Sequence, residues 1–389
     1  MRLEQVCALG IQPGLGRMRK LLRQLGHPER GLNFIHIAGT NGKGSTAAAI
    51  DSILRAAGFF SGLYTSPHLV DFRERFQCGG TMVEEVVLQR NLRILIRKIS
   101  KWPKRGRPTF FEATTALALQ IFREVKVDFV VWETGLGGRL DATNVVGPEC
   151  CVLTSLGRDH EAVLGRGWKN IGREKAGILK RGVPVFSAPW PKEARGVLAQ
   201  EAQRLGCPWQ VVRPLRKGQD RWPLAGAHQR QNFGLAAAVA RYLGFPDAVV
   251  ARGLDRTSWP GRFMNLPGRH RRVLDGAHNR EGVRAALATW REQFGGEPAR
   301  VIFGCLRDKP AEEMLREIRG TGAQVWGVQL QDARGGDPLE WKIRPDRLWR
   351  SVAEAMEEDG KVPIQSGTFI LGSLVLVGEV MCWEDGRRA

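Results

Sequence analysis

Short apolar runs alternate with helix-length segments along most of this chain, and this alternation restricts its fold more than any other feature. It begins with a predicted strand at 32–38 and a predicted helix at 43–57. Further strands are predicted at 60–65, 128–132, 151–154 and 183–186, and further helices at 83–100, 109–125, 194–205 and 229–243. Strands that alternate with helices run parallel and bury both faces of their sheet. The sequence therefore predicts an α/β fold with a doubly wound, mostly parallel sheet.

The alternation breaks at residues 255–268, DRTSWPGRFMNLPG, which hold two prolines and two glycines. Because 389 residues exceed the usual size of one hydrophobic core, this break predicts two domains, residues 1–258 and 259–389. The second is expected to be a smaller α/β domain. Its strands are predicted at 272–274, 300–303 and 324–328, and its helices at 281–294, 311–318 and 346–356, before a last apolar run at 369–380.

The composition limits the classes of binding partner and the cellular compartment that we expect for this protein. A net charge of +19 favours anionic partners such as nucleotides, polycarboxylates or nucleic acid. Since no basic run with interleaved aromatics and no nucleic-acid-binding motif occurs, we expect solvated arginine-rich faces and no nucleic acid partner. Seven scattered cysteines without a C-x-x-C pair, and no apolar segment of membrane-spanning length, predict a cytoplasmic protein with no membrane association.

A glycine-rich turn joins the first strand to the first helix in IHIAGTNGKGST, residues 35–46. Backbone N–H groups, a helix N-terminus and Lys43 converge there, as phosphate binding requires. The strict Walker A pattern has glycine where Ile37 stands and Ser or Thr where Gly44 stands, so this is a shortened variant. The alternative is a tight turn with Ser45 and Thr46 near the helix start. The residues predicted to bind ATP here are Gly39, Thr40, Asn41, Gly42, Lys43, Gly44 and Ser45.

Three polar residues follow predicted strands at the edge of the sheet that carries this turn. They are Ser66 in YTSPHL, Glu133 in VVWETGLGGRLDATN and His160 in TSLGRDHEAVLG. Because ligands of open α/β sheets bind at the carboxyl ends of the strands, we expect them to converge as metal ligands. Taken singly, Ser66 is typical of a turn, Glu133 of a paired structural carboxylate and His160 of a loop histidine.

Eight motifs occur in one order from about Gly31 to GSLVLVGEV at 372–380. They are HIAGTNGKGS, YTSPHLV, ETGLGGRLDATN, REKAGILKRGVPV, AGAHQRQN, WPGRF, LDGAHN and FGCLRDKP. This series resembles the folylpolyglutamate synthase / dihydrofolate synthase family of the ATP-dependent Mur ligase superfamily. The resemblance implies a P-loop ATPase-like first domain, a smaller Rossmann-like glutamate ligase domain, ATP bound between them, and a monomer.

The resemblance also implies the reaction, in which an amide forms between L-glutamate and a folate-type carboxylate through an acyl phosphate. The acceptor is dihydropteroate, a tetrahydrofolate polyglutamate, or both. ATP becomes ADP and phosphate. Two Mg²⁺ ions are implied, one on Ser66 and Glu133 and one reaching Glu133 and His160. Lys175 in EKAG is implied to carry a carbamate that helps bind the second ion or orients substrate, the alternative being a surface lysine.

Further roles follow from the same resemblance. The catalytic set is Lys43, Glu133, His160, Lys175 and Arg262, with Arg262 toward the γ-phosphate. The other nucleotide contacts are Gln229, Asn232, Asp275 near the ribose, and His278. Asp141 is a candidate folate contact or, alternatively, an N-cap. Arg75 is a candidate partner of a substrate carboxylate or, alternatively, of Glu74 or another acid.

Three departures from the family pattern are Arg158, Arg280 and Cys305, of which the arginines could alter the cleft. Another amide ligase of the superfamily, such as a poly-γ-glutamate type, is the alternative function. Peptidoglycan Mur ligases carry a nucleotide-sugar domain for which we expect no room in the 38 residues before Gly39. A P-loop switch or a nucleic-acid-dependent ATPase leaves WPGRF and LDGAHN unexplained.

Overall fold

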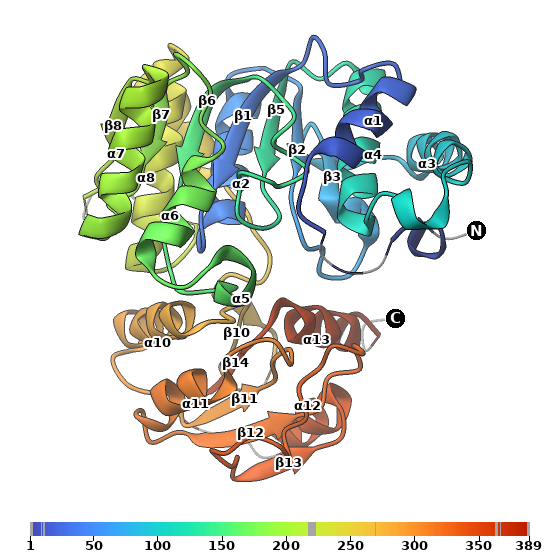
Figure 1. The fold of residues 1–389 in the computed structure, drawn as a ribbon. Helices are drawn as coiled ribbons and strands as arrows, with labels where there is room; N and C mark the ends of the chain where they lie inside the picture. The colour runs from blue at the N-terminus through green and yellow to red at the C-terminus, as the bar shows by residue number, and fades with distance from the viewer. Residues whose placement is uncertain are drawn as a thin grey trace. The chain divides into compact units, whose positions relative to one another are not determined.

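The computed structural model describes residues 3–8, 10, 12–216, 223–268, 270–361, 365 and 367–386. The chain divides into two compact units, which Figure 1 draws as ribbons. The first contains Met1–His68, Phe72–Pro223 and Arg230–Thr257, and the second contains Leu69–Asp71, Leu224–Gln229 and Ser258–Ala389. The functional assignment of the two predicted domains remains a prediction.

An eight-stranded sheet forms the centre of the first unit, in the order β4-β3-β2-β5-β1-β6-β7-β8. Its strands are β1 (Asn33–Ala38), β2 (Ser61–Tyr64), β3 (Phe76–Cys78), β4 (Thr81–Met82), β5 (Phe129–Glu133), β6 (Pro148–Leu153), β7 (Val185–Ser187) and β8 (Trp209–Val211). From β2 to β8 all neighbours are parallel, whereas β3 and β4 pair antiparallel at one edge. The predicted mostly parallel α/β sheet is therefore confirmed.

Helices cover this sheet on both faces, as the burial of β1 requires. Phe34 and Ala38 point to one face and Ile35 and Ile37 to the other, and all four are buried. The helices are α1 (Gly16–Gln24), α2 (Lys43–Ala56), α3 (Glu85–Ile99), α4 (Phe110–Val125), α5 (Glu161–Leu164), α6 (Trp168–Ala176), α7 (Lys192–Leu205), α8 (Ala227–Tyr242) and α9 (Asp247–Asp255). Thr109 starts α4 with a reciprocal capping box to Glu112, which fixes where this helix begins.

The second unit contains a six-stranded sheet in the order β13-β12-β11-β14-β10-β9, in which β9 alone is antiparallel. Its elements are β9 (Met264–Leu266), β10 (Arg272–Asp275), α10 (Arg280–Phe294), β11 (Arg300–Phe303), α11 (Ala311–Arg319), β12 (Gln324–Val328), β13 (Arg347–Trp349), α12 (Val352–Lys361), β14 (Thr368–Leu371) and α13 (Leu374–Gly386). Alternate strand residues enter two cores: Val301 and Phe369 lie in one, Ile302 and Ile370 in the other. Both faces of this sheet are therefore covered as well.

The helix predicted at 346–356 is wrong over its first part. Residues Arg347–Trp349 form β13, and the helix begins only at Val352. The edge of the sheet determines this outcome, because β12 pairs with β13 and the Asp346 carboxylate accepts a hydrogen bond from the Val325 N–H at 2.6 Å. The last apolar run is likewise divided between β14 and α13, with Gly372 at φ +132° between them.

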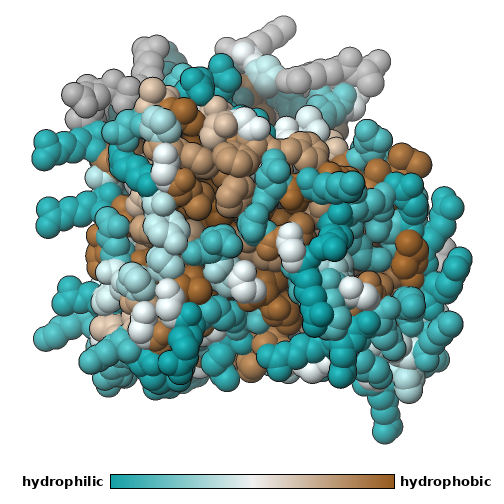
Figure 2. All heavy atoms as spheres, turned by 90° about the horizontal axis from the view of Figure 1, so that it is seen from above, coloured by the Kyte–Doolittle hydropathy of each residue, from teal (hydrophilic) through white to brown (hydrophobic). Residues whose placement is uncertain are grey.

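On the face drawn in Figure 2, hydrophilic side chains surround apolar ones that are exposed between them. Exposed large apolar residues are spread along the chain, as Phe60, Val163 and Leu339 illustrate. Within the part of the chain that the structure describes, no helix has the length and apolarity needed to cross a membrane.

Candidate functional site

The phosphate loop, residues 39–45, follows the carboxyl end of β1 and includes the first three residues of α2. Two of its glycines have left-handed backbone angles, with φ of +155° at Gly39 and +86° at Gly42. A Cβ at Gly39 would lie 1.8 Å from Oγ1 of Thr154, and one at Gly42 would lie 2.3 Å from Oδ1 of Asn232. The loop therefore needs glycine at both positions, for conformation and for space.

The loop that follows β6 holds the phosphate loop in place. The Thr40 N–H donates to the Ser155 carbonyl at 2.9 Å, and Thr40 Oγ1 donates to the Gly157 carbonyl at 3.1 Å. Thr154 Oγ1 donates to the Asn41 carbonyl at 2.8 Å. Two neighbouring strand ends therefore share one hydrogen-bonded arrangement, which holds the phosphate loop in this conformation.

Two lysines converge on this loop. Lys43 Nζ donates to the carbonyls of Gly39 at 3.2 Å and Thr40 at 3.1 Å, and Lys175 Nζ donates to the Gly39 carbonyl at 2.7 Å. Lys175 is only 3% exposed, so the alternative of a surface lysine is wrong. Its burial, and then the positive charge of Lys43, lower the pKa of Lys175 to about 7, although Asp159 opposes the shift. Lys175 is therefore partly neutral near pH 7.

Ser66 and Glu133 meet at the carboxyl ends of the adjacent strands β2 and β5. The backbone N–H of Ser66 donates to Oε2 of Glu133 at 3.1 Å, and Glu133 is 4% exposed. His160 belongs to the loop after β6 and N-caps the short helix α5 in a left-handed conformation, with its Nε2 3.8 Å from Oδ1 of Asp159.

The donor set fits a magnesium ion. Mg²⁺ takes one or two carboxylates and completes its octahedron with water and substrate phosphate oxygens. The oxygen-bearing side chains of Ser66 and Glu133 match this preference. Across the residues that the structure describes, no three His, Cys, Asp or Glu side chains are gathered so that they could hold a metal ion by themselves.

The two predicted substrate contacts are both buried. Arg75 is 7% exposed and its Nε donates to Nδ1 of His68 at 2.8 Å, so it is not a surface residue. Asp141 does not N-cap a helix, because the residues that follow it, 142–145, form turns. Its carboxylate accepts hydrogen bonds from the N–H groups of Gly135, Leu136 and Thr143 and from the Thr143 hydroxyl. Asp141 therefore organises the turn that follows Glu133.

The second unit groups its own predicted residues around the end of β10. Oδ2 of Asp275 accepts from the Phe263 N–H at 2.9 Å, and Nη1 of Arg262 donates to the Gly261 carbonyl at 3.0 Å. A Cβ at Gly276 would lie 2.4 Å from that Nη1, so glycine makes room for the guanidinium. The Nδ1–H of His278 donates to the Gly276 carbonyl at 2.8 Å.

Sequence reasoning missed His228, which precedes the buried Gln229. Burial lowers the pKa of His228, while the charge of Asp275 raises it and that of Arg262 lowers it. The position of His228 in the motif AGAHQRQN was the available signal.

The three departures from the family pattern have local structural roles. The Arg158 guanidinium lies over the Trp168 ring, 5.4 Å from its centroid. Arg280 begins α10 and pairs with Glu317 at 2.8 Å. Cys305 is buried in a core of the second unit, and burial raises the pKa of its thiol to about 12.

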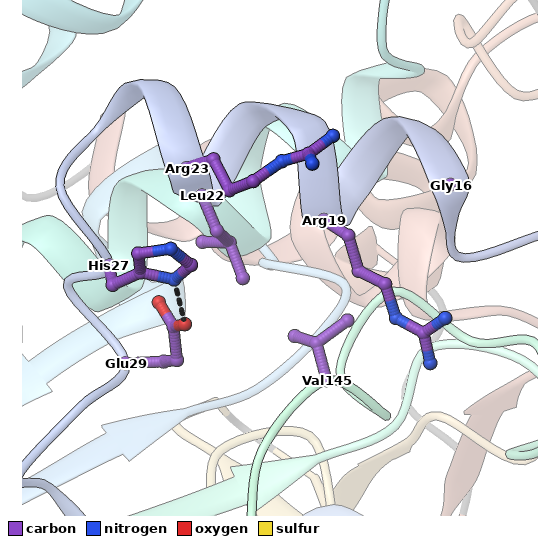
Figure 3. A pocket seen from close by; sticks show the side chains of 7 residues that line it. All are labelled: Gly16, Arg19, Leu22, Arg23, His27, Glu29 and Val145. Carbon is purple, nitrogen blue, oxygen red and sulfur yellow. Dashed lines mark hydrogen bonds and ion pairs between the residues drawn. The ribbon is translucent and has the colours of Figure 1, made fainter.

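A cavity of about 390 Å³ lies against α1, away from the phosphate loop. It is lined by Arg19, Leu22 and Arg23 of α1, by His27 and Glu29, and by Val145 (Figure 3). Val145 lies three residues before the start of β6, at the amino ends of the strands, whereas the phosphate loop follows a carboxyl end. The cavity contains none of the predicted site residues.

Replacing Gly42 by alanine should raise the KM for ATP by about tenfold or more, because the new Cβ would overlap Asn232 and the backbone would be strained by roughly 1–2 kcal/mol. Steady-state kinetics at varied ATP would measure this change. Gly58→Ala is the matched control, since Gly58 has φ +91° but a Cβ added there would have nothing within 4 Å. Equal effects of the two substitutions would show that backbone strain alone, and not contact with Asn232, explains the result.

Comparison with known proteins places this geometry in a family. Residues 261–359 match the model of the Mur ligase glutamate ligase domain. The chain is 39% identical to the dihydrofolate synthase/folylpolyglutamate synthase of Bacillus subtilis over 95% of both chains, and 31% identical to the folylpolyglutamate synthase of Lacticaseibacillus casei over 94% of this chain and 92% of that one.

Solved structures agree with the sequence relatives. E. coli FolC in complex with DHPP and ADP superposes with a TM-score of 0.90 at 29% identity, over 100% of this chain and 97% of that one. Mycobacterium tuberculosis folylpolyglutamate synthase, complexed with ADP and AMPPCP, gives a TM-score of 0.87 at 27% identity, over 96% and 95%. This chain therefore belongs to the folylpolyglutamate synthase / dihydrofolate synthase family, and residues 261–359 of its second unit match the Mur ligase glutamate ligase domain.

Proposed function

We propose that this protein is an ATP-dependent ligase that joins the amine of L-glutamate to a folate-type carboxylate, giving ADP and phosphate. The observation that carries the proposal is a preformed phosphate loop with Lys43 inside a chain that aligns over 95% of its length with a dihydrofolate synthase/folylpolyglutamate synthase. We further infer that it acts as a monomer in the cytoplasm and without nucleic acid.

The reaction needs activation because a carboxylate is a poor acyl donor. A carboxylate oxygen of the folate attacks the γ-phosphorus of ATP, and the bond to the β,γ-bridging oxygen breaks, which releases ADP and leaves an acyl phosphate. The glutamate amine then attacks the acyl carbon, and phosphate leaves from the tetrahedral intermediate. Lys43 and the N–H groups of residues 42–45 neutralise charge on the β- and γ-phosphates, so the protein contributes mainly positioning and electrostatic stabilisation.

Ser66 and Glu133 would hold one Mg²⁺, and Glu133 with His160 a second. When bound, these ions supply positive charge next to the phosphates. The adjacency of Ser66 and Glu133 at 3.1 Å supports the first site. Because Glu133 already accepts the Ser66 N–H, its carboxylate is oriented before the ion arrives.

The remaining site residues are proposed in the roles that the family resemblance implies. Arg262 stabilises the γ-phosphate and Asp275 lies toward the ribose, with His278, Gln229 and Asn232 as further nucleotide contacts. The Asn232 side chain lies so close to the phosphate loop that a Cβ added at Gly42 would be 2.3 Å from its Oδ1, and this closeness supports the role of Asn232. For the acceptor, buried Arg75 offers a guanidinium for a carboxylate, and the Asp141 turn contacts the folate.

The function is tested by phosphate release from Mg-ATP and glutamate, with dihydropteroate or tetrahydrofolate as acceptor. We expect release with at least one acceptor, and a product heavier by one glutamate residue. The preferred acceptor shows whether the dihydrofolate synthase or the folylpolyglutamate synthase reaction dominates. ATP binding without release on either acceptor would contradict the folate assignment and favour another carboxylate, such as a poly-γ-glutamate chain.

Lys175 is proposed to react with CO₂ to form a carbamate. A neutral amine is required for this addition, and the lowered pKa of about 7 supplies it at physiological pH. The nitrogen lone pair of the neutral amine attacks the carbon of CO₂ and one proton is released, so the neutral buried amine becomes an anion beside Lys43. Such an anion would bind the second Mg²⁺ or orient substrate.

We expect protein equilibrated with ¹³C-bicarbonate to show a carbamate resonance by ¹³C NMR that is absent from Lys175→Arg. Lys169→Arg is the matched control, since Lys169 is an exposed lysine on the same helix. Removing CO₂ should lower the rate of ligation reversibly. An identical carbon spectrum for wild-type protein and Lys175→Arg would contradict the proposal.

A further inference from the structure

A buried chain of hydrogen bonds links the middle of β1 to the turn after β5, two strands that lie side by side in Figure 1. Nε2 of His36 lies 2.9 Å from Oγ1 of Thr143, and this hydroxyl donates to Oδ1 of Asp141 at 2.6 Å. His36 and Thr143 are fully buried, and Asp141 is 7% exposed. Neither His36 nor Thr143 belongs to the proposed catalytic machinery.

The direction of each bond follows from proton counting. A threonine hydroxyl has one hydrogen, and here it is directed to the Asp141 carboxylate. His36 must therefore donate through its Nε2, which fixes the Nε2–H tautomer. Its Nδ1 then carries a lone pair, and this buried atom has no hydrogen-bond partner among the described residues.

The ring remains neutral for the same reason. Protonation of Nδ1 would bury an N–H group without an acceptor, which is unfavourable. Burial and, to a smaller extent, the charge of Lys180 lower the pKa of His36 to about 3. The imidazole is therefore a fixed hydrogen-bond donor at every physiological pH.

The far end of this chain organises the turn that begins directly after Glu133. Oδ2 of Asp141 accepts from the N–H groups of Gly135 at 3.1 Å and Leu136 at 2.8 Å. Nε1 of Trp132 donates to the Thr143 carbonyl at 3.0 Å. His36 and Trp132 are paired across β1 and β5, so both side chains reach Thr143 from the same face of the sheet.

We infer that His36 and Thr143 are positioning residues that hold the Asp141 turn in the one conformation that receives the acceptor carboxylate substrate. This inference rests on the proposed function, in which that turn contacts the folate. The two residues act through Asp141 and the backbone of residues 134–143, and they do not touch substrate.

The first test is Thr143→Val, which keeps the side-chain shape but leaves both His36 and Asp141 without their bond. We expect the KM for the folate acceptor to rise about tenfold or more, and the KM for ATP to change less than about twofold, because an unpaired buried group moves while the phosphate loop keeps its own bonds. Thr143→Ser restores the hydroxyl and should restore the acceptor KM. Thr257→Val is the matched control, because the buried Thr257 hydroxyl donates only to the Gly253 carbonyl of α9.

Coupling is tested by a double-mutant cycle. His36→Leu should resemble Thr143→Val, and the double variant should be no worse than the more impaired single variant, since all three break the same chain. Additive effects, equal defects in Thr143→Val and Thr143→Ser, or a parallel rise in the KM for ATP would overturn the inference.

An assay-independent readout separates this inference from the proposed function. In protein labelled with ¹⁵N-histidine, the His36 signals, identified by their loss in His36→Leu, should report the Nε2–H tautomer and remain unchanged between pH 5 and 8. An Nδ1–H tautomer would overturn the inference even in an active enzyme. If the wild-type protein accepts no folate, the proposed function fails, whereas the tautomer and a double-mutant cycle on unfolding free energy still decide whether the three side chains are coupled.

Discussion

Replacing Lys43 by alanine is expected to reduce ATP-dependent phosphate release on the order of a thousandfold, because removing one donor aimed at developing charge costs about that much. The ammonium group lies inside the phosphate loop, 3.2 Å from the Gly39 carbonyl and 3.1 Å from the Thr40 carbonyl. The positive charge of Lys43 therefore already lies within the loop that would bind the phosphate oxygens. Initial rates of phosphate release at saturating ATP, acceptor and glutamate would measure the loss.

Two comparisons make this result specific. Lys169→Ala removes an exposed lysine from α6 and should leave the rate within about twofold of wild type, as surface substitutions usually do. Lys43→Arg keeps the charge but not the compact ammonium geometry, so it should recover only part of the rate. A Lys43→Ala protein with an unchanged melting temperature and wild-type turnover would contradict the assigned role.

The fold was predictable where periodicity and burial act together. Both sheets were anticipated because parallel strands buried on two faces are continuous apolar runs, as IHIA before Gly39 illustrates. The helix predicted at 346–356 was wrong over its first part, because an edge strand of three residues has no period long enough to distinguish it from a helix start. Its identity depends on pairing with β12, which is a tertiary contact.

The motifs of the candidate site were predictable from the sequence, but the buried contacts that hold them in place were not. Lys43 follows from local sequence, since loop and helix are contiguous. The burial of Lys175 was not evident from the sequence, because its Nζ donates to the Gly39 carbonyl, which lies 136 residues away in the chain. His36 was missed for a related reason. Nothing in the sequence around a histidine in an apolar strand indicates that Thr143, 107 residues away, is its hydrogen-bond partner.

The largest expected effect on stability is in the second unit, where one carboxylate binds the first residues of three adjacent strands. Asp359 is fully buried and accepts hydrogen bonds from Arg272 Nε at 2.7 Å, Arg300 Nη1 at 2.5 Å and Thr368 Oγ1 at 2.6 Å. These donors begin β10, β11 and β14. His270 Nε2 lies 3.0 Å from the same carboxylate. Two buried guanidinium groups thus share this negative charge, and Arg272 Nη1 also lies 3.7 Å from Oε1 of Glu384.

Asp359→Asn should therefore lower the free energy of unfolding of the second unit by about 3–5 kcal/mol, the usual cost of removing one partner from a buried ion pair. Asparagine keeps the shape but removes the negative charge that both Arg272 and Arg300 contact at 2.7 Å or less. Urea unfolding followed by tryptophan fluorescence would measure the change, since Trp326 is buried and lies 3.9 Å beneath the Arg300 guanidinium. Asp247→Asn is the matched control: it breaks an exposed pair with Arg241 at 2.8 Å and should cost less than about 1 kcal/mol. Equal stability of the two variants would mean that the strand ends are held by packing and not by Asp359.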